Sequence, residues 1–292
     1  MDGMLDGIQI LAPAKVNIGL NVYPKREDGF HNIESIFQTV KLYDKLTIFP
    51  IPEKNVCKVD CLELELPKEN TLTLTYEAFC ALTGCDFGVK VTLEKHIPSG
   101  AGLGGGSSDA AYFLKALAEL NGIFLDENLA DKVASKVGSD VFFFLHAEEN
   151  EQKNACAIVT GRGEFVKKID SRNDLYFLLV FPEVCVSTKD AYGLLDNSYC
   201  EGNFTSCPKL TELEDIYRRP LKDWTFANSF TSVLLQKYPV IGEALGDVKK
   251  SGAVWADVSG SGATVFGVFD DRKNALEAFT LLKKRWTHCV LA

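Results

Sequence analysis

Residues 98–111 read PSGAGLGGGSSDAA, which is the most informative stretch of the chain. Five glycines, at positions 100, 102, 104, 105 and 106, are followed by Ser107, Ser108 and Asp109. Glycine adopts positive φ readily and lets a ligand approach the backbone closely. Apolar residues at positions 110, 113, 114 and 117 then recur at helical spacing. The stretch therefore predicts a glycine-rich turn that leads into a helix, with Ser107 or Ser108 as the cap and Asp109 in the first turn.

The start of such a helix is a natural anion site, because backbone N–H groups and the positive end of the helix dipole meet there. The pattern alone leaves three interpretations open: a phosphate site, a plain surface turn and a dinucleotide site. The P-loop pattern is excluded, since no lysine follows the glycines. Gly100-x-Gly102-x-x-Gly105 matches the dinucleotide fingerprint, but Glu119, at the required separation, lies inside the predicted helix instead of ending a second strand.

The composition is that of an ordinary globular protein. The chain has 292 residues, 46% of them hydrophobic, and a formal net charge of −9. This length suits two domains or one large one. The acidic balance argues against nucleic acid and anionic membranes as partners, and no apolar run approaches the ~18 residues of a transmembrane helix. The first eleven residues lack the basic start of a signal peptide, and the nine scattered cysteines form no CxxC pair, so we expect reduced thiols and a cytoplasmic location.

The N-terminal region predicts a strand at residues 8–11, which Pro13 interrupts, and a second strand at residues 15–22. In this second strand apolar and polar residues alternate, which is typical of a half-buried strand. Lys15 and Asn17 share its polar face. Taken alone, the pattern favours a solvated face for both residues.

Phe30 and His31 follow the turn signal Asp28-Gly29. An aromatic ring beside a histidine could stack on a flat ligand and hydrogen-bond to it. The local pattern favours the plainer interpretation, in which Phe30 plugs the core and His31 is exposed.

The rest of the chain predicts strands and helices that alternate irregularly. Strands are expected at residues 36–42 and 45–49, paired around Tyr43-Asp44, and at 57–66, 89–93, 155–159, 174–181 and 264–269. Helices are expected at 71–82 with Asn70 as cap, from 126 to 138, and at 187–195, 226–238, 241–245 and 273–286. Polar loops are expected at 146–154 and 197–213. Residues 141–145 are too few to assign by period. This order indicates an α+β fold in two parts, with domains at residues 1–163 and 164–292.

Three separated segments together resemble the GHMP small-molecule kinases. They are APAKVN at residues 12–17, the glycine-rich stretch at 98–111 and VSGSGA at 258–263. DGFHNIES at residues 28–35 and GSDV at 138–141 sharpen the resemblance. It implies a two-domain α+β GHMP kinase fold with the active site in the interdomain cleft. It also implies phosphoryl transfer from ATP to the 2-hydroxyl of a cytidine-diphosphate-linked methylerythritol, in non-mevalonate isoprenoid synthesis.

The resemblance also implies a role for each matched residue. Lys15 and Asp140 match the catalytic pair, and Asn17 lies beside them on the substrate side. Phe30 and His31 match the pair that holds cytosine. The expected ATP-binding residues are Pro98, Ser99, Gly100, Ala101, Gly102, Leu103, Gly104, Gly105, Gly106, Ser107 and Ser108, with Asn70 and Lys95 beside the adenosine. Mg²⁺ is expected to bridge the phosphates; the sequence predicts neither the metal ligands nor the oligomeric state.

This chain departs from the family pattern at three places. Phe30 stands where the family usually has tyrosine, Phe142 stands where it usually has proline, and a polar insertion occupies residues 148–154. Three alternative functions stay open from the residues: another GHMP kinase acting on mevalonate, homoserine or a sugar, a dinucleotide-dependent oxidoreductase, and a non-catalytic nucleotide-binding module. Substrate-dependent ATP turnover separates the first from the others.

Overall fold

The computed structural model describes residues 7–292, which form two compact units interleaved along the chain. The first unit comprises the described chain up to Ala14, Leu42–Ser99 and Gly104–His146; the second comprises Lys15–Lys41, Gly100–Leu103 and Ala147–Ala292. The domain boundary expected between residues 163 and 164 stays a prediction. The expectation about a signal peptide rests partly on residues 1–6, which lie outside the described residues.

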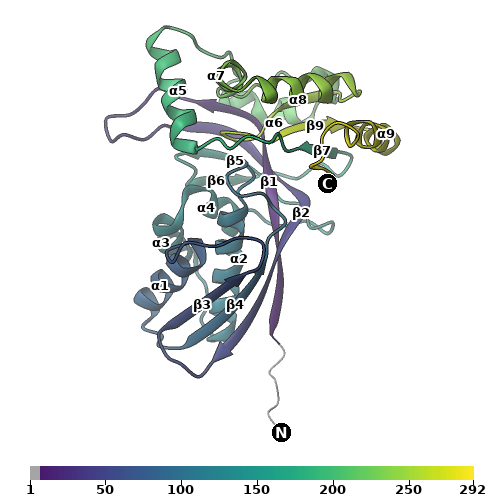
Figure 1. The fold of residues 1–292 in the computed structure, drawn as a ribbon. Helices are drawn as coiled ribbons and strands as arrows, with labels where there is room; N and C mark the ends of the chain where they lie inside the picture. Colours follow the sequence, from purple (N-terminus) through teal and green to yellow (C-terminus); the bar gives the residue numbers. More distant parts are fainter. Residues whose placement is uncertain (1–6) are drawn as a thin grey trace. The chain divides into compact units, whose positions relative to one another are not determined.

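The first unit packs four helices beside a small sheet (Figure 1). Its elements are β3 (Val56–Cys61), α1 (Thr71–Thr83), β4 (Gly88–Glu94), α2 (Gly105–Leu120), α3 (Glu127–Val137) and α4 (Ser139–His146), with parts of β1 (Ile8–Val22) and β2 (Ile33–Ile51). β3 runs parallel to β4, and β4 pairs antiparallel with Lys45–Ile51 of β2. Phe79, Val91 and Phe113 are fully buried in the core between helices and sheet.

Two long strands correct the expected pattern at the N-terminus. Pro13 does not interrupt β1, because the fixed φ of proline lies within the β region. The residue removes only one N–H donor from the strand. β2 continues through Tyr43-Asp44, where a turn between two paired strands was predicted. Asp44 does not bend its own backbone. Its Oδ1 accepts hydrogen bonds from the backbone amides of His96 at 2.6 Å and Ile97 at 2.8 Å.

The helices confirm most predicted caps and correct one of them. Asn70 caps α1, and Asp126 caps α3, which ends at Gly138. The expected serine cap of α2 is wrong, since the cap position is Gly104 with φ at 68° and both serines lie inside the first turn. Asp109, which was expected in that turn, comes directly after it. The unassigned run 141–145 is helical and belongs to α4.

The second unit holds two groups of paired strands. Ile33–Gln38 of β2 pairs antiparallel with β5, and β5 pairs with β6; the other sheet has the order β10-β7-β9-β8. The elements are β5 (Cys156–Gly161), β6 (Phe165–Lys168), β7 (Tyr176–Val180), α5 (Thr188–Cys200), α6 (Leu213–Arg218), α7 (Thr231–Lys237), α8 (Pro239–Lys250), β8 (Trp255–Val258), β9 (Val265–Phe269), α9 (Arg272–Leu282) and β10 (Cys289–Leu291), with short 3₁₀ turns at Leu210–Glu212 and Leu221–Asp223. The helix α5 extends into the predicted loop at 197–213, and β8 had no counterpart in the prediction.

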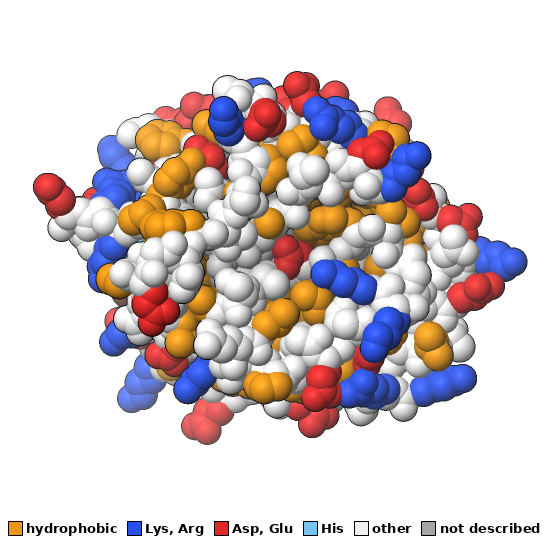
Figure 2. All heavy atoms as spheres, turned by 90° about the horizontal axis from the view of Figure 1, so that it is seen from above, with side chains coloured by type: hydrophobic (Ala, Val, Ile, Leu, Met, Phe, Trp, Pro, Cys, Tyr) orange, Lys and Arg blue, Asp and Glu red, His pale blue; other side chains and the backbone are white. Residues whose placement is uncertain are grey.

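The surface carries charges of both signs. Figure 2 shows one face, on which acidic and basic side chains alternate around apolar ones. None of the helices in residues 7–292 is long and apolar enough to cross a membrane. All nine cysteines lie in the described range and are free thiols.

Candidate functional site

Three of the segments that carry the family resemblance meet within the second unit. The backbone amide of Lys15 donates to the carbonyl of Leu103 at 2.9 Å. The hydroxyl of Ser259 donates to the carbonyl of Gly102, also at 2.9 Å. The amide of Thr264 donates to the carbonyl of Ala101 at 3.3 Å. The middle of the glycine-rich loop is therefore held by β1 on one side and by the segment between β8 and β9 on the other.

Lys15 and Asn17 lie in the interior, which corrects the expectation of a solvated strand face. Only 3% of Lys15 and 1% of Asn17 is exposed. The Lys15 Nζ donates to the Asn17 Oδ1 at 2.7 Å and to the Gly102 carbonyl at 3.2 Å, and it lies 4.6 Å from the ring centroid of Phe37. A buried ammonium requires such partners, because desolvation is costly. The polar face of β1 thus places a fixed positive charge against the loop.

Gly102 shows why this loop needs glycine. Its φ is +77°, and a Cβ at this position would lie 2.0 Å from the carbonyl oxygen of Ser259. No other residue type fits without moving the backbone. The close approach of the two glycine-rich segments is therefore specified by the sequence itself.

The start of α2, in the first unit, has the features of an anion site. Within residues 7–292 no side chain caps this helix, and the buried hydroxyl of Ser108 has no hydrogen-bond partner. Ser107 is half-buried in the same turn. Gly138 lies beside it, since a Cβ there would be 3.9 Å from the Ser107 Oγ. Asp140 follows two residues later, half-buried in the first turn of α4, so its helix begins next to the start of α2.

Asn70 and Lys95 flank the same region of the first unit. The Asn70 side chain is engaged as the cap of α1, accepting from the amides of Leu72 and Thr73. The Lys95 ammonium forms ion pairs with Asp44 and Asp109, and its side chain is 7% exposed. Their contact with adenosine stays a prediction. In the structure both side chains already have partners, Asn70 in the cap of α1 and Lys95 in its two ion pairs.

Phe30 and His31 reverse the local expectation. Phe30 is 51% exposed and His31 is 8% exposed. The guanidinium carbon of Arg162 lies 4.7 Å from the Phe30 ring centroid. The His31 Nδ1 lies 2.8 Å from the carbonyl oxygen of Tyr23, so Nδ1 must carry a proton, because a carbonyl only accepts.

Two further residues lie beside the His31 ring. Its Nε2 lies 3.4 Å from a carboxylate oxygen of Asp196, and its ring centroid lies 4.7 Å from that of Tyr192. The imidazole is thus held at Nδ1 and packed on one face. It can position a ligand without first losing side-chain freedom.

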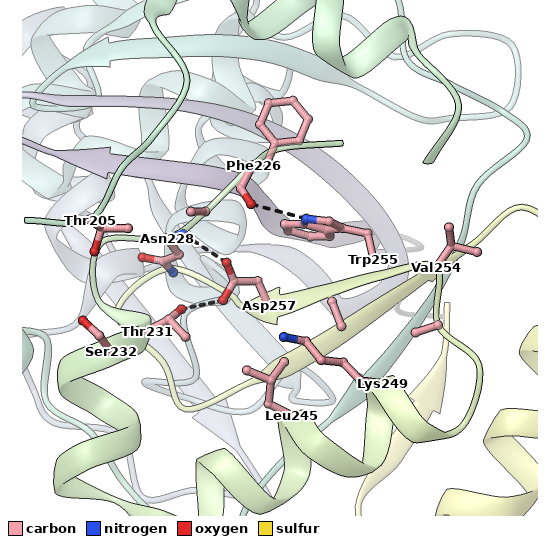
Figure 3. Close-up of a pocket in the computed structure, with 13 residues that line it drawn as sticks. Thr205, Phe226, Asn228, Thr231, Ser232, Leu245, Lys249, Val254, Trp255 and Asp257 are labelled. Carbon is pink, nitrogen blue, oxygen red and sulfur yellow. Dashed lines mark hydrogen bonds between the residues drawn. The ribbon is translucent and has the colours of Figure 1, made fainter. Parts of the chain in front are cut away.

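A separate pocket of about 480 Å³ lies in the second unit (Figure 3). Its floor contains the buried carboxylate of Asp257, which accepts from the hydroxyl of Thr231 and, at 3.0 Å, from the amide of Asn228. The Asn228 side-chain amide donates to the carbonyls of Val258 and Gly260 at 2.9 and 2.8 Å. These bonds support the glycine-rich segment that holds the loop.

The predicted site residues therefore fall into two groups. Lys15, Asn17 and Gly100–Leu103 belong to the second unit, with Phe30 and His31; Asn70, Lys95, Pro98, Ser99, Gly104–Ser108 and Asp140 belong to the first. The convergence of Lys15 and Asp140 on one oxygen stays a prediction. Among residues 7–292 no cluster of three or more His, Cys, Asp or Glu side chains is arranged to hold a metal ion.

Sequence reasoning missed several residues around these groups. Arg162 and Asp196 were not singled out. Ser259 was named only within the segment at residues 258–263, and the ion partners of Lys95 were named only as a turn residue, Asp44, and as a helix residue, Asp109. Only Asp44 had a local signal, as a carboxylate inside an apolar strand run.

Comparisons with known proteins identify the family of the chain. Residues 70–148 match the GHMP kinases N terminal domain, and residues 212–288 match the GHMP kinases C terminal domain. A 4-diphosphocytidyl-2-C-methyl-D-erythritol kinase of Treponema pallidum is 37% identical over 292 residues, covering 98% of each chain. A crystal structure of 4-(cytidine 5'-diphospho)-2C-methyl-D-erythritol kinase superimposes with a TM-score of 0.77 at 30% identity, covering 97% of this chain and 98% of the other. A homoserine kinase from Cytophaga hutchinsonii, 17% identical with a TM-score of 0.72 over 100% of this chain and 95% of its own, shares the fold. The chain belongs to the GHMP kinase family.

Proposed function

We propose that this enzyme transfers the γ-phosphoryl group of ATP to the 2-hydroxyl of 4-(cytidine 5'-diphospho)-2-C-methyl-D-erythritol, a step of non-mevalonate isoprenoid precursor synthesis. The observation that carries the proposal is the meeting of Lys15, the loop at Gly102 and Ser259 in one hydrogen-bonded group. A buried cation beside a glycine-rich loop suits a polyphosphate. The substrate is the one named for the relatives that align over nearly the full chain.

The chemistry requires position and charge more than covalent help. The backbone amides at the start of α2 would hold the phosphates. The ammonium of Lys15 would stabilise negative charge that develops on the transferred group. Asp140 would accept the hydroxyl proton or orient the hydroxyl, since a loose transition state demands little early proton removal.

The acceptor's base would be held by Phe30 and His31. Arg162 already covers one face of the Phe30 ring, so the other face is the one that a cytosine would use. The fixed His31 would contribute a polar contact at the edge of the base. Phenylalanine keeps the stacking of the usual tyrosine but loses its hydroxyl.

Mg²⁺ would neutralise phosphate charge and align the oxygens of the transferred group. The residues present fit such an ion in chemistry, because the hydroxyls of Ser107 and Ser108 lie in the first turn of α2 and that of Ser108 has no partner among the described residues.

We also propose a cytoplasmic enzyme, in keeping with nine free thiols, with a small-molecule substrate and no nucleic-acid partner.

The test is ADP release by the purified chain with ATP and Mg²⁺, with and without the cytidine diphosphate substrate. Mevalonate, homoserine and a hexose serve as competing acceptors. We expect turnover with the cytidylyl substrate alone, and a product whose ³¹P spectrum shows a new phosphomonoester. Equal turnover with another alcohol would assign a different GHMP kinase activity. ATP binding without turnover on any acceptor would indicate a nucleotide-binding module.

A further inference from the structure

Three ionisable side chains form a closed group inside the first unit. The Lys95 Nζ lies 2.9 Å from the Asp109 Oδ2 and also pairs with Asp44. The side chains of Lys95, Asp109 and Asp44 are 7%, 3% and 0% exposed. Burying charges at this depth is costly unless each has a partner. The proposed reaction assigns no step to this group, so its place in the fold needs another explanation.

The three residues lie at the two ends of the glycine-rich loop. Lys95 follows the last residue of β4, and Asp109 lies in α2 just after its first turn, so the loop is the chain between them. Asp44 lies on β2, and its second oxygen accepts from the amides of His96 and Ile97, where the loop begins. One lysine therefore joins the entry of the loop to its exit, and Asp44 anchors that lysine to the sheet.

The ammonium also supports the helix start directly. A Cβ on Gly105, the first residue of α2, would lie 3.0 Å from the Lys95 Nζ and 2.9 Å from the Ile97 Cγ2. The first turn of α2 therefore rests on the ion group with no room for a side chain. A shift of Lys95 would therefore alter the packing beneath the first turn of α2.

We propose that Asp44, Lys95 and Asp109 are positioning residues that fix both ends of the phosphate loop before ATP binds. The inference rests on the proposed function. A glycine-rich loop loses more conformational freedom on ordering than any other segment of its length. Because the ion group joins the two ends of the loop, part of this freedom is already lost in the free enzyme. Less of the binding free energy is then needed to order the loop.

The state of Asp109 indicates how the group can be tested. Burial raises the pKa of Asp109 to about 7, against the opposing effect of Lys95. Its Oδ1 has no hydrogen-bond partner among residues 7–292. Asparagine has the size of Asp109 and keeps an oxygen that can accept from Lys95, while Asp44 still balances the ammonium. A leucine of similar size cannot accept from Lys95 at all.

The experiment compares Asp109→Leu with Asp109→Asn. In Asp109→Leu we expect the KM for ATP to rise about tenfold, equivalent to one further backbone residue to be ordered on binding. The KM for the acceptor and kcat should stay within about twofold, because binding lost equally from ground and transition states leaves kcat unchanged. Backbone amides of residues 99–105 should exchange hydrogen faster, while those of β4 should not. Asp109→Asn should restore both measurements.

Thr75→Val is the matched control, because it removes a buried hydroxyl that donates at 2.7 Å to the Thr71 carbonyl within α1. The proposal is overturned if Asp109→Leu leaves the ATP KM and the loop exchange unchanged, or if Asp109→Asn is as impaired as the leucine variant. It is equally overturned if both KM values rise together with a fall in Tm, as general destabilisation would produce. If the leucine variant does not fold, Asp109→Ala removes the same contact with a good helix-forming residue. Should the wild type phosphorylate no acceptor, the proposed function fails, and the hydrogen-exchange comparison still decides the role of the ion group.

Discussion

Truncation of Phe30 to alanine separates a ligand-binding role from a structural one. The ring is 51% exposed, and its one described aromatic or cationic contact is the guanidinium of Arg162, 4.7 Å away. Little of the core therefore depends on it. If Phe30 stacks on the cytosine of the acceptor, the loss should appear in acceptor binding and hardly at all in folding.

The two expected effects differ in size. A base stacked on an aromatic side chain contributes about 1–3 kcal/mol, so the KM for the cytidylyl substrate should rise by about 5- to 150-fold. Loss of the exposed cation–π contact costs about 0.5–1 kcal/mol of folding stability. For a chain of this size that shifts Tm by only about 1–4 °C.

The assay is steady-state ADP release, with the cytidylyl substrate varied at saturating ATP and then ATP varied at saturating acceptor. Phe124→Ala is the control, since Phe124 is also an exposed ring, 87% accessible, and belongs to no proposed site. Its kinetics should match those of the wild type. A higher KM for ATP in Phe30→Ala, or an unchanged KM for the acceptor, would refute the assignment of Phe30 to the base.

Three further predictions follow from the site. Asp140→Asn should keep ATP affinity, measured by calorimetry, and lose about 10²- to 10⁴-fold in turnover; near-normal turnover would remove Asp140 from the mechanism. Gly102→Ala should destabilise the chain by about 1–3 kcal/mol in urea unfolding and reduce turnover, because the new Cβ meets the Ser259 carbonyl at a positive φ; wild-type stability and turnover together would contradict the loop geometry. Because burial raises the pKa of Asp109 from 3.8 to about 7, the folded chain binds more protons than the unfolded chain in that interval. The contribution of Asp109 to the free energy of unfolding should therefore be present below about pH 4 and be lost as the pH rises to about 7. The difference in unfolding free energy between the wild type and Asp109→Asn measures this contribution. A difference that does not change with pH would show that the Asp109 carboxyl is not the group responsible.

Local chemistry was sufficient for much of the fold. Asn70 predicts the start of α1 because its side chain accepts from the amides of the first turn, as the structure shows. Asp126 starts α3 in the same way, because its side chain accepts from the amide of Leu129, and Gly138 follows the last residue of that helix. The family was also predictable, because short motifs at three distant places keep the order and spacing of the family. The match to the family models and to the relatives confirms it.

The errors arose where a residue's partner lies far away in the sequence. A Tyr-Asp pair between two apolar runs is typical of a turn. Here Asp44 instead accepts from the amides of His96 and Ile97, more than fifty residues later. No window of sequence contains that information. β2 was therefore predicted as two strands although it is one.

The site residues show the same limitation more sharply. Hydropathy assigned Lys15 to a solvated face, Phe30 to the core and His31 to the solvent, and the structure reverses all three. Their roles came from the resemblance to a family and not from the pattern. Hydropathy ranks average behaviour, whereas a binding site exposes rings and buries polar groups because a ligand will complete their surroundings.

The departures from average behaviour are gathered at one feature of the chain. The Lys15 Nζ meets the middle of the glycine-rich loop at Gly102, and Lys95 with its two carboxylate partners closes the ends of the loop. Each is a buried charge, and apolar side chains of similar volume could fill the same space at lower cost. Such conflicts between local preference and final position are expected mainly where function requires them. A second chain of this fold with apolar residues at both lysine positions and at positions 44 and 109 should therefore fold and fail to hold a triphosphate.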